Sequence, residues 1–282
     1  QMSFLSSAFH TLFYSFWAPI CGLILGVSLV LYLIPIILTK VLPPVNIKKK
    51  YNTDWALVTG ASSGIGAELV DQLAQQGLNV VLVALDDDTL AKHVKAMQLK
   101  YPKLEFRKVG VDLTNSDSEN TTTGYMHLIR ENTKDIDVGA VFSNAGFFTF
   151  GNFDQIPLAK HLGHVECNQL AGLKLTHHFF SKWKKEKRRG LLSFTVSSVA
   201  FFPSPYSVIY GATKSFLKNF IESFAVEAAH HGVDVLEFSP QYTRTRLYDK
   251  TMKLGILDLF AYFGSEPADV ARCMLQSVGK VT

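Results

Sequence analysis

Two patterns of hydrophobic and polar positions divide this chain. Residues 16–42 are almost all apolar, and no Lys, Arg, Asp or Glu occurs from residue 1 to residue 39. From residue 51 onward, short apolar runs alternate with segments in which apolar residues recur at helical spacing. The first pattern is typical of a membrane-spanning helix and the second of an α/β domain. We therefore expect a membrane anchor with its basic flank at residues 1–50 and a single domain at residues 51–282.

The alternation in the domain predicts a parallel sheet with helices on both faces. Strands are expected at residues 55–59, 79–84, 104–111, 138–143, 191–196 and 233–238. Helices are expected at residues 65–76, 89–101, 158–187 and 207–230, with another after residue 114. Such an order is typical of a doubly wound, Rossmann-type α/β fold. Ligands of this fold bind beyond the carboxyl ends of the strands, so the candidate site residues should lie there.

The apolar segment is long enough to span a bilayer. Its 27 residues would extend roughly 40 Å as a helix, whereas a bilayer core of about 30 Å needs about 20 residues. A cleaved signal peptide has a charged start and a shorter apolar run, and a buried core helix rarely reaches this length. Lys40 and the three lysines at residues 48–50 follow the segment directly, which predicts that the domain faces the cytosol.

Composition and charge exclude some other classes. The chain has 282 residues, of which 48% are apolar and 18% charged, and a net charge of +4. The basic run at residues 182–189 lacks a base-stacking motif and fits a solvated helix end, so we expect no nucleic-acid partner. Cys21, Cys167 and Cys273 are too scattered for a disulfide framework, as in a reducing compartment, and no metal site is expected.

Tyr210 and Lys214 suggest a reaction. Residues four apart lie on one face of a helix. An ammonium about 5 Å from a phenol, at an effective dielectric constant near 20, would lower the pKa of the phenol by about two. Such a phenol could donate and accept the proton in a carbonyl–alcohol interconversion.

Further candidates follow other predicted strands. Gly60, Gly64 and Gly66 occupy the turn from the first strand into the first helix, where a diphosphate could approach the helix N-terminus. Asp112 follows the third strand, where it could accept from an adenine amine or could serve only as a turn or N-cap residue. The tripeptide at residues 144–146 follows the fourth strand. Its small residues could let the chain pass close to a cofactor, or it could form an ordinary turn.

The motifs TGASSGIG, VDLT, NAG, VSS and YxxxK, in this order and at these spacings, resemble the short-chain dehydrogenase/reductase superfamily over about residues 52–282. The resemblance implies a Rossmann-type NAD(P)(H) oxidoreductase. Tyr210 would be the general acid/base, Lys214 would bind the nicotinamide ribose, and the backbone of Asn168 would hold a water in the proton relay. A serine would bind the substrate oxygen; Ser197 has the usual offset from Tyr210, whereas Ser198 matches the second serine of the motif. Cys167, beside Asn168, is expected to serve packing.

The same resemblance implies a cofactor-binding set, in which Thr245 would contact the carboxamide. Its members are Gly60, Ser62, Ser63, Gly64, Ile65, Gly66, Asp86, Asp112, Asn144, Ala145, Gly146, Tyr210, Lys214, Pro240, Thr243 and Thr245. The chain departs from the family pattern at Ser143, where an asparagine is usual, and at Gln241, where a glycine is usual. The domain also ends before the seventh strand of the family, which suggests truncation.

The cofactor is left undecided between NADP(H) and NAD(H). Asp86 stands where an acidic residue favours the free ribose hydroxyls of NAD, and Leu85 stands where NADP-using relatives often carry arginine. Asp86, Asp87 and Asp88 would repel a 2′-phosphate if they face it, or could cap the next helix and face water. The resemblance to membrane-anchored relatives points instead to NADPH.

The substrate is expected to be hydrophobic. Apolar residues are concentrated at 254–263 and at 201–203. These segments could form the apolar entrance of a pocket near the bilayer, or a lid packed on the domain itself. With the anchor, these segments resemble the endoplasmic-reticulum branch of very-long-chain 3-oxoacyl-CoA reductases and 17-beta-hydroxysteroid dehydrogenase type 12. That resemblance implies a ketone on a lipid or steroid as substrate, with 3-ketodihydrosphingosine as an alternative. A catalytically idle membrane or lipid-droplet scaffold is the competing function, and a homodimer is left open.

Overall fold

The computed structural model describes residues 11, 13–115, 124–245, 247 and 264–280. Among these residues a six-stranded sheet has the order β3-β2-β1-β4-β5-β6, and every neighbouring pair is parallel. The strands are β1 (Trp55–Thr59), β2 (Asn79–Ala84), β3 (Phe106–Gly110), β4 (Val138–Ser143), β5 (Gly190–Thr195) and β6 (Val233–Phe238). The order reverses between β1 and β4, which is the arrangement of a doubly wound fold, so the predicted fold class is confirmed.

Helices cover both faces of the sheet. The helices are α3 (Ile47–Tyr51), α4 (Gly64–Gln75), α5 (Asp88–Lys100), α6 (Tyr125–Glu131), α7 (Leu158–Val165), α8 (Ala171–Glu186), α9 (Val208–Ala229) and α11 (Pro267–Ser277). One buried core joins α3, α4, α5 and α11 to one face, and a second joins α6, α8 and α9 to the other. Every side chain of β1 is buried, because apolar layers cover the strand on both sides.

The helix expected over residues 158–187 is not a continuous α-helix. A π-helical turn, Glu166–Leu170, separates α7 from α8. The apolar spacing continues through the turn, which is why the sequence pattern did not predict it. Such turns are rare and often occur at functional sites, and this one carries Asn168.

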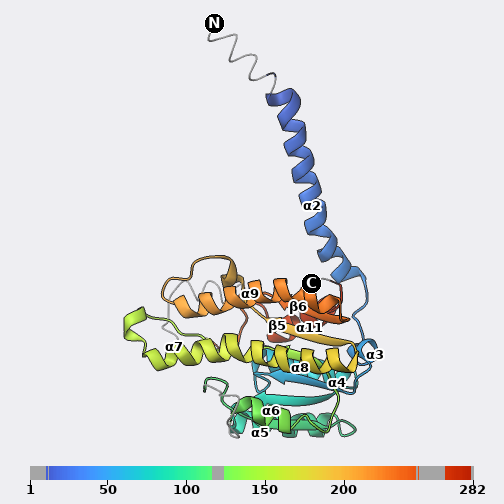
Figure 1. Ribbon diagram of the computed structural model, residues 1–282, viewed down its shortest axis with the longest axis vertical. Coiled ribbons are helices and arrows are strands. Elements are labelled where there is room, and N and C mark those ends of the chain that lie inside the picture. Colours follow the sequence, from blue (N-terminus) through green and yellow to red (C-terminus); the bar gives the residue numbers. More distant parts are fainter. Residues whose placement is uncertain (1–10, 12, 116–123, 246, 248–263, 281–282) are drawn as a thin grey trace.

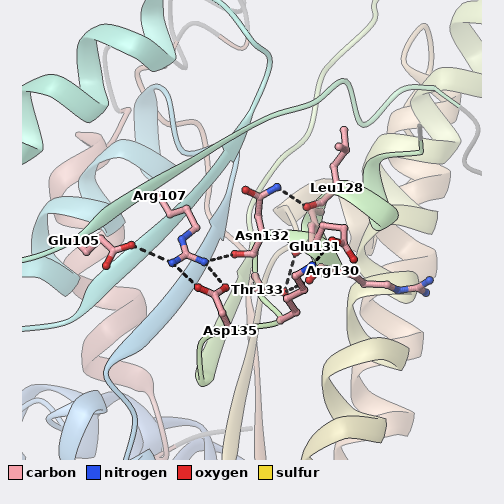
Figure 2. Close-up of polar contacts among 10 residues, drawn as sticks. Glu105, Arg107, Leu128, Arg130, Glu131, Asn132, Thr133 and Asp135 are labelled. Atoms are coloured by element: carbon pink, nitrogen blue, oxygen red, sulfur yellow. Dashed lines mark hydrogen bonds and ion pairs between the residues drawn. The ribbon is translucent and has the colours of Figure 1, made fainter. Parts of the chain in front are cut away.

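The end of the sheet opposite to the carboxyl ends of the strands holds polar clusters. Figure 2 shows Arg107 of β3 donating to both carboxylate oxygens of Asp135, to Glu105 and to the carbonyl of Asn132. These contacts fix the turn between α6 and β4. The basic run at residues 182–189 lies at this edge too, since it ends α8 and leads into the start of β5, and Arg188 forms an ion pair with Asp137.

A long apolar helix projects from the domain. The helix α2 (Ala18–Val41) follows a π-helical turn, η1 (Phe13–Trp17), and Figure 1 shows it extending away from the layered part of the molecule. Residues Phe13–Ile34 have a mean hydropathy of 2.2 and none of the span is buried. The segment Phe13–Ile34 therefore has the length and composition of a membrane span.

Candidate active site

Tyr210 and Lys214 lie on the inward face of the first turns of α9. Their side chains are only 4% and 3% exposed. The Lys214 amine donates to the carbonyl oxygen of Thr195, at the end of β5, over 2.7 Å, and it lies 5.7 Å from the centre of the Tyr210 ring. The predicted pair therefore meets at the carboxyl end of a central strand.

The two candidate serines differ in their relation to the phenol. Ser197 is buried, and its hydroxyl acts to lower the pKa of Tyr210. Ser198 begins the short 3-10 helix η4 (Ser198–Phe201), is partly exposed, and donates its backbone N–H to the carbonyl of Pro240 over 3.2 Å. Ser197 is thus the serine that could share a substrate oxygen with Tyr210.

The electrostatics of the pair differ from the expectation. Burial raises the pKa of Tyr210, and the influence of the Ser197 hydroxyl, which lowers this pKa, only partly offsets the rise. Burial also lowers the pKa of Lys214 to about 8. The predicted lowering of the phenol pKa by the ammonium was wrong for this structure, because both groups are taken out of water and desolvation disfavours each charged form.

Asn168 braces the chain beside this pair. Its side-chain oxygen accepts from the N–H of Phe147, and its side-chain nitrogen donates to the carbonyl of Phe147, each over 3.0 Å. Asn168 is almost fully buried in the π-helical turn. A Cβ atom on Gly146 would lie 3.3 Å from the Asn168 oxygen and 3.7 Å from the Lys214 amine. The segment after β4 therefore passes directly over the lysine.

The glycine turn lies at the switch point between β1 and β4. Gly60 has φ +64°, and a Cβ there would lie 2.9 Å from the Cα of Ala145. A Cβ on Gly66 would overlap the carbonyl oxygen of Gly60. Ser63 precedes α4 without capping it through its side chain, so the first N–H groups of α4 are available to an anion. These features fit a dinucleotide diphosphate, and Ser62 and Ile65 lie in the same turn.

Asn144 joins three strands at this end of the sheet. Its backbone N–H donates to the Thr59 hydroxyl over 2.9 Å, and its side-chain nitrogen donates to the Thr59 carbonyl over 3.2 Å. The Thr195 hydroxyl in turn donates to the Asn144 side-chain oxygen over 3.0 Å. The sequence did not single out Thr59 and Thr195 as site residues, because a threonine at a strand end is common.

The candidate acidic residues have different roles. Asp87 accepts from the N–H of Leu90 and caps α5, as one of the alternatives expected. Asp86, with a side chain 65% exposed, pairs with Lys108 of β3 over 2.6 Å.

Asp112 forms a turn, in which one carboxylate oxygen accepts from the N–H and the hydroxyl of Thr114. The turn alternative is therefore realised at Asp112, and among the described residues no side-chain hydrogen bond to its second carboxylate oxygen is found.

The loop after β6 returns to the glycine turn. Thr243 is buried and bonds the carbonyl of Gln241. The methyl carbon of Thr245 would lie 3.0 Å from a Cβ on Gly64, which has φ +57°. Gln241 is not among the described residues with positive φ, so the loop does not need the usual glycine there. The apolar segment expected at residues 254–263 lies outside the described residues.

His164 is a site residue that the sequence analysis missed. It is fully buried, one helical turn before Asn168, and its ring lies 5.9 Å from the Tyr210 ring. Its Nδ1 atom is 3.2 Å from the Thr149 hydroxyl, and its Nε2 atom has no hydrogen-bond partner among the described residues. Burial lowers the pKa of His164 to about 4, so the ring is neutral. The sequence signal that could have identified His164 is its position four residues before Asn168, one helical turn away.

Cys167 lies beside Asn168 in the same π-helical turn. Burial raises the pKa of its thiol to about 12. The thiol therefore stays protonated at neutral pH, as expected for a residue that serves packing.

Comparisons with known proteins agree on one family. A family model described as short chain dehydrogenase matches residues 54–253. The very-long-chain 3-oxoacyl-CoA reductase of Podospora anserina is 31% identical over 208 residues, which are 72% of this chain and 58% of that protein. The 7beta-hydroxysteroid dehydrogenase of Clostridium sardiniense is 29% identical over 236 residues, which are 83% of this chain and 85% of that protein. The chain thus spans less than two thirds of the Podospora reductase.

Solved structures share the fold. A short-chain dehydrogenase from Sphingobium yanoikuyae in complex with NADPH has a TM-score of 0.66 at 23% identity, over 77% of this chain and 81% of that one. A short chain dehydrogenase/reductase from Burkholderia phymatum in complex with NAD has a TM-score of 0.66 at 18% identity, over 79% and 84%. At these identities the likeness concerns the fold alone.

Proposed function

The chain belongs to the short-chain dehydrogenase family, and on that premise we propose that it is a membrane-anchored oxidoreductase acting on a lipid or steroid. It would reduce a ketone with a nicotinamide dinucleotide, or oxidise the corresponding alcohol. The observation that carries the proposal is the meeting of Ser197, Tyr210 and Lys214 in one buried cluster at the carboxyl ends of the strands. The glycine turn, with its open helix N-terminus, lies at the same edge of the sheet.

Each residue has a role that its position supports. Ser197 would hold the substrate oxygen by a hydrogen bond, and Tyr210 would donate its phenolic proton to that oxygen. Because burial raises the pKa of Tyr210, the phenol is kept in the protonated form that a reduction requires. Lys214 would orient the ribose and support the return of a proton to Tyr210, and Asn168 would keep the neighbouring chain in place. When bound, the nicotinamide supplies or accepts the hydride.

The cofactor-binding residues leave both NAD and NADP as candidate cofactors. Asp86 could accept from the free ribose hydroxyls of NAD, while its partner Lys108 could pair with the 2′-phosphate of NADP. The solved relatives likewise include complexes with NADPH and with NAD.

A matched pair of variants would decide the cofactor. If the ribose hydroxyls bind Asp86, then Asp86→Asn raises the KM for NAD by about tenfold, equivalent to ~1.4 kcal/mol, and Lys108→Gln does not. If a 2′-phosphate binds Lys108, then Lys108→Gln raises the KM for NADP instead. Equal effects of both variants on both cofactors would contradict a role for the pair in this choice.

The substrate class is supported by the relatives and by the apolar helix. The Podospora relative is a 3-oxoacyl-CoA reductase and the Clostridium relative a hydroxysteroid dehydrogenase, so ketones on fatty acyl chains and on steroids are the first candidates. An anchor through α2 would place the domain at a membrane, and the basic flank favours the cytosolic face of the endoplasmic reticulum. Residues 1–50 would then be the anchor and 51–282 the catalytic domain.

The test is turnover on a ketone panel. The full chain, purified in lipid nanodiscs, is expected to oxidise NADPH or NADH when given a long-chain 3-oxoacyl-CoA, a ketosteroid or 3-ketodihydrosphingosine. The loss of nucleotide absorbance measures this reaction. Quenching of protein fluorescence by the nucleotide without turnover on any of the three would favour the alternative of an idle scaffold that retains the fold. A protein that shows no nucleotide binding and no turnover would contradict both the oxidoreductase and the idle scaffold.

A further inference from the structure

The loop between β5 and α9 displays an exposed aromatic surface. Phe201, Phe202 and Tyr206 are 58%, 61% and 56% exposed, and Val208 is 49% exposed. Residues 199–213 contain no Asp, Glu, Lys, Arg or His. Apolar side chains of this size rarely cluster on a surface that faces only water, so the patch indicates a partner.

The loop is held rigidly, so its rings are displayed rather than loosely exposed. The N–H of Gly151 donates to the Tyr206 carbonyl over 2.8 Å, and the N–H of Ser207 donates to the Ser204 carbonyl over 3.2 Å. A Cβ on Gly211 would lie 2.9 Å from the Ser204 side chain, which shows how closely the loop packs on α9. Tyr206 has φ +62°, which is rare for an aromatic residue and is tolerated where a local constraint requires it.

The position of the loop indicates which partner it fits. In Figure 1 the loop that enters α9 lies on the side of the domain from which α2 projects, whereas α5 lies on the opposite side. A bilayer spanned by α2 would therefore face this loop. Aromatic residues are favoured at such an interface, because their rings suit the boundary between headgroups and acyl chains.

The aromatic surface is also connected to the candidate reaction centre. The ring of Tyr206 lies 5.7 Å from that of Phe150, Phe150 lies 6.4 Å from Phe148, and Phe148 lies 5.0 Å from Tyr210. Beside the loop, a groove of about 560 Å³ is lined by Phe201, Phe202 and Val208. Aromatic rings thus run from the surface to the phenol.

We propose that residues 201–208 form a second membrane contact, in which Phe201, Phe202 and Tyr206 enter the lipid surface beside the bilayer segment spanned by α2. The inference rests on the proposed membrane anchor and deepens the proposed function, because it lets a membrane-dissolved ketone approach Tyr210 along the series of rings. It does not depend on turnover.

The test uses tryptophan fluorescence in the full chain, reconstituted in vesicles with and without brominated phosphatidylcholine. Of the native tryptophans, Trp17 is in the apolar N-terminal segment, while Trp55 and Trp183 are buried in the domain. In a Trp17→Phe background, the Phe202→Trp variant is expected to lose fluorescence in brominated vesicles. The matched control is Leu99→Trp, which is expected to lose none: the Leu99 side chain is 75% exposed, and its helix, α5, lies on the side of the domain opposite to α2 (Figure 1).

Equal emission of the Phe202→Trp variant in both kinds of vesicle, repeated with Phe201→Trp, would overturn the membrane contact. If that emission depends instead on protein concentration in detergent, a second copy of the chain covers the patch, and the proposal is likewise overturned. Quenching of Trp17 in the parent chain reports the anchor separately. The two readouts therefore distinguish failure of the anchor from failure of the loop contact, and a catalytically idle protein would give the same fluorescence result.

Discussion

At the scale of single residues, the candidate site is defined by what burial does to its ionisable groups. Tyr210, Lys214 and His164 are all removed from water. Burial raises the pKa of Tyr210 and lowers the pKa of Lys214 and of His164, so in each group the neutral form is favoured. The sequence spacing predicted that Tyr210 and Lys214 share a helix face. It could not predict the desolvation, which depends on the strands and loops that enclose the pair.

The choice of serine gives a paired prediction at this scale. Ser197→Ala is expected to reduce kcat by about 10²–10³-fold, because the variant removes the hydroxyl that contacts Tyr210 and would hold the developing charge on the substrate oxygen. Ser198→Ala should leave kcat nearly unchanged, because Ser198 contributes a backbone N–H to Pro240. Steady-state kinetics of the two variants check this, and a greater loss in Ser198→Ala would contradict the assignment.

Lys214 predicts a pH dependence of stability. Its pKa falls from 10.5 in the unfolded chain to about 8 in the folded protein, so between these values the unfolded chain binds more protons. The free energy of unfolding therefore rises with pH through this window, and the cost of burying the ammonium, about 3 kcal/mol, is fully present only below it.

The measurement compares the wild type with Lys214→Met, whose side chain does not titrate. The difference in free energy of unfolding between the two proteins should shift in favour of the wild type from about pH 7 to about pH 10. The hydrogen bond to Thr195 that the variant loses adds an offset that does not vary in this way. A difference that stays constant over this range would show that Lys214 is not desolvated as described.

At the scale of elements, the glycine turn and the π-helical turn position the site by close packing. Gly60, Gly64 and Gly66 let the turn approach Ala145, Thr245 and its own backbone more closely than any side chain would allow. Asn168 projects from the π-helical turn and holds the segment after β4 through Phe147. Two loops and a helix start thereby meet at one edge of the sheet.

Gly66 gives the prediction for this scale. In Gly66→Ala the added methyl group overlaps the Gly60 carbonyl, and overpacking of this kind costs about 1–3 kcal/mol. Because the strain falls on the turn itself, we expect nucleotide affinity to drop by about tenfold or more in a fluorescence titration. Gly172→Ala is the control and should leave affinity unchanged, since its methyl group would meet only side chains, the nearest being the Ser143 hydroxyl at 3.1 Å, and no part of the glycine turn. Equal affinities in the two variants would contradict the role of the turn.

The elements were also where the sequence was most informative. The strands β1, β2, β4 and β6 begin and end at the predicted residues. For β1, β2 and β4 the reason is that apolar runs buried on both faces have sharp limits. The interruption at Glu166–Leu170 was not predictable, since a π-helical turn changes hydrogen bonding but leaves the apolar spacing almost unaltered. Asn144 was a candidate from its motif, but its links to Thr59 and Thr195 depend on strands far apart in the sequence.

At the scale of the whole molecule, one end of the sheet gathers residues from five separate parts of the chain. The glycine turn, Asn144, Asn168, Ser197 and the start of α9 all lie at the carboxyl ends of the strands, where a doubly wound fold binds its ligands. The basic run at residues 182–189 lies at the other edge. The apolar helix α2 and the aromatic loop before α9 lie on one side of the domain (Figure 1), as the proposed uptake of substrate from a membrane would require.

The central claim is that the Tyr210 hydroxyl transfers the proton in a reaction at this edge of the sheet. The most direct measurement is single-turnover oxidation of bound NADPH or NADH by a ketone substrate in Tyr210→Phe, beside a fluorescence titration of the same variant with the nucleotide. Removing only the hydroxyl is expected to lower the rate by at least about 10²-fold while the nucleotide affinity stays within about twofold of the wild type. A variant that turns over at the wild-type rate would contradict the account.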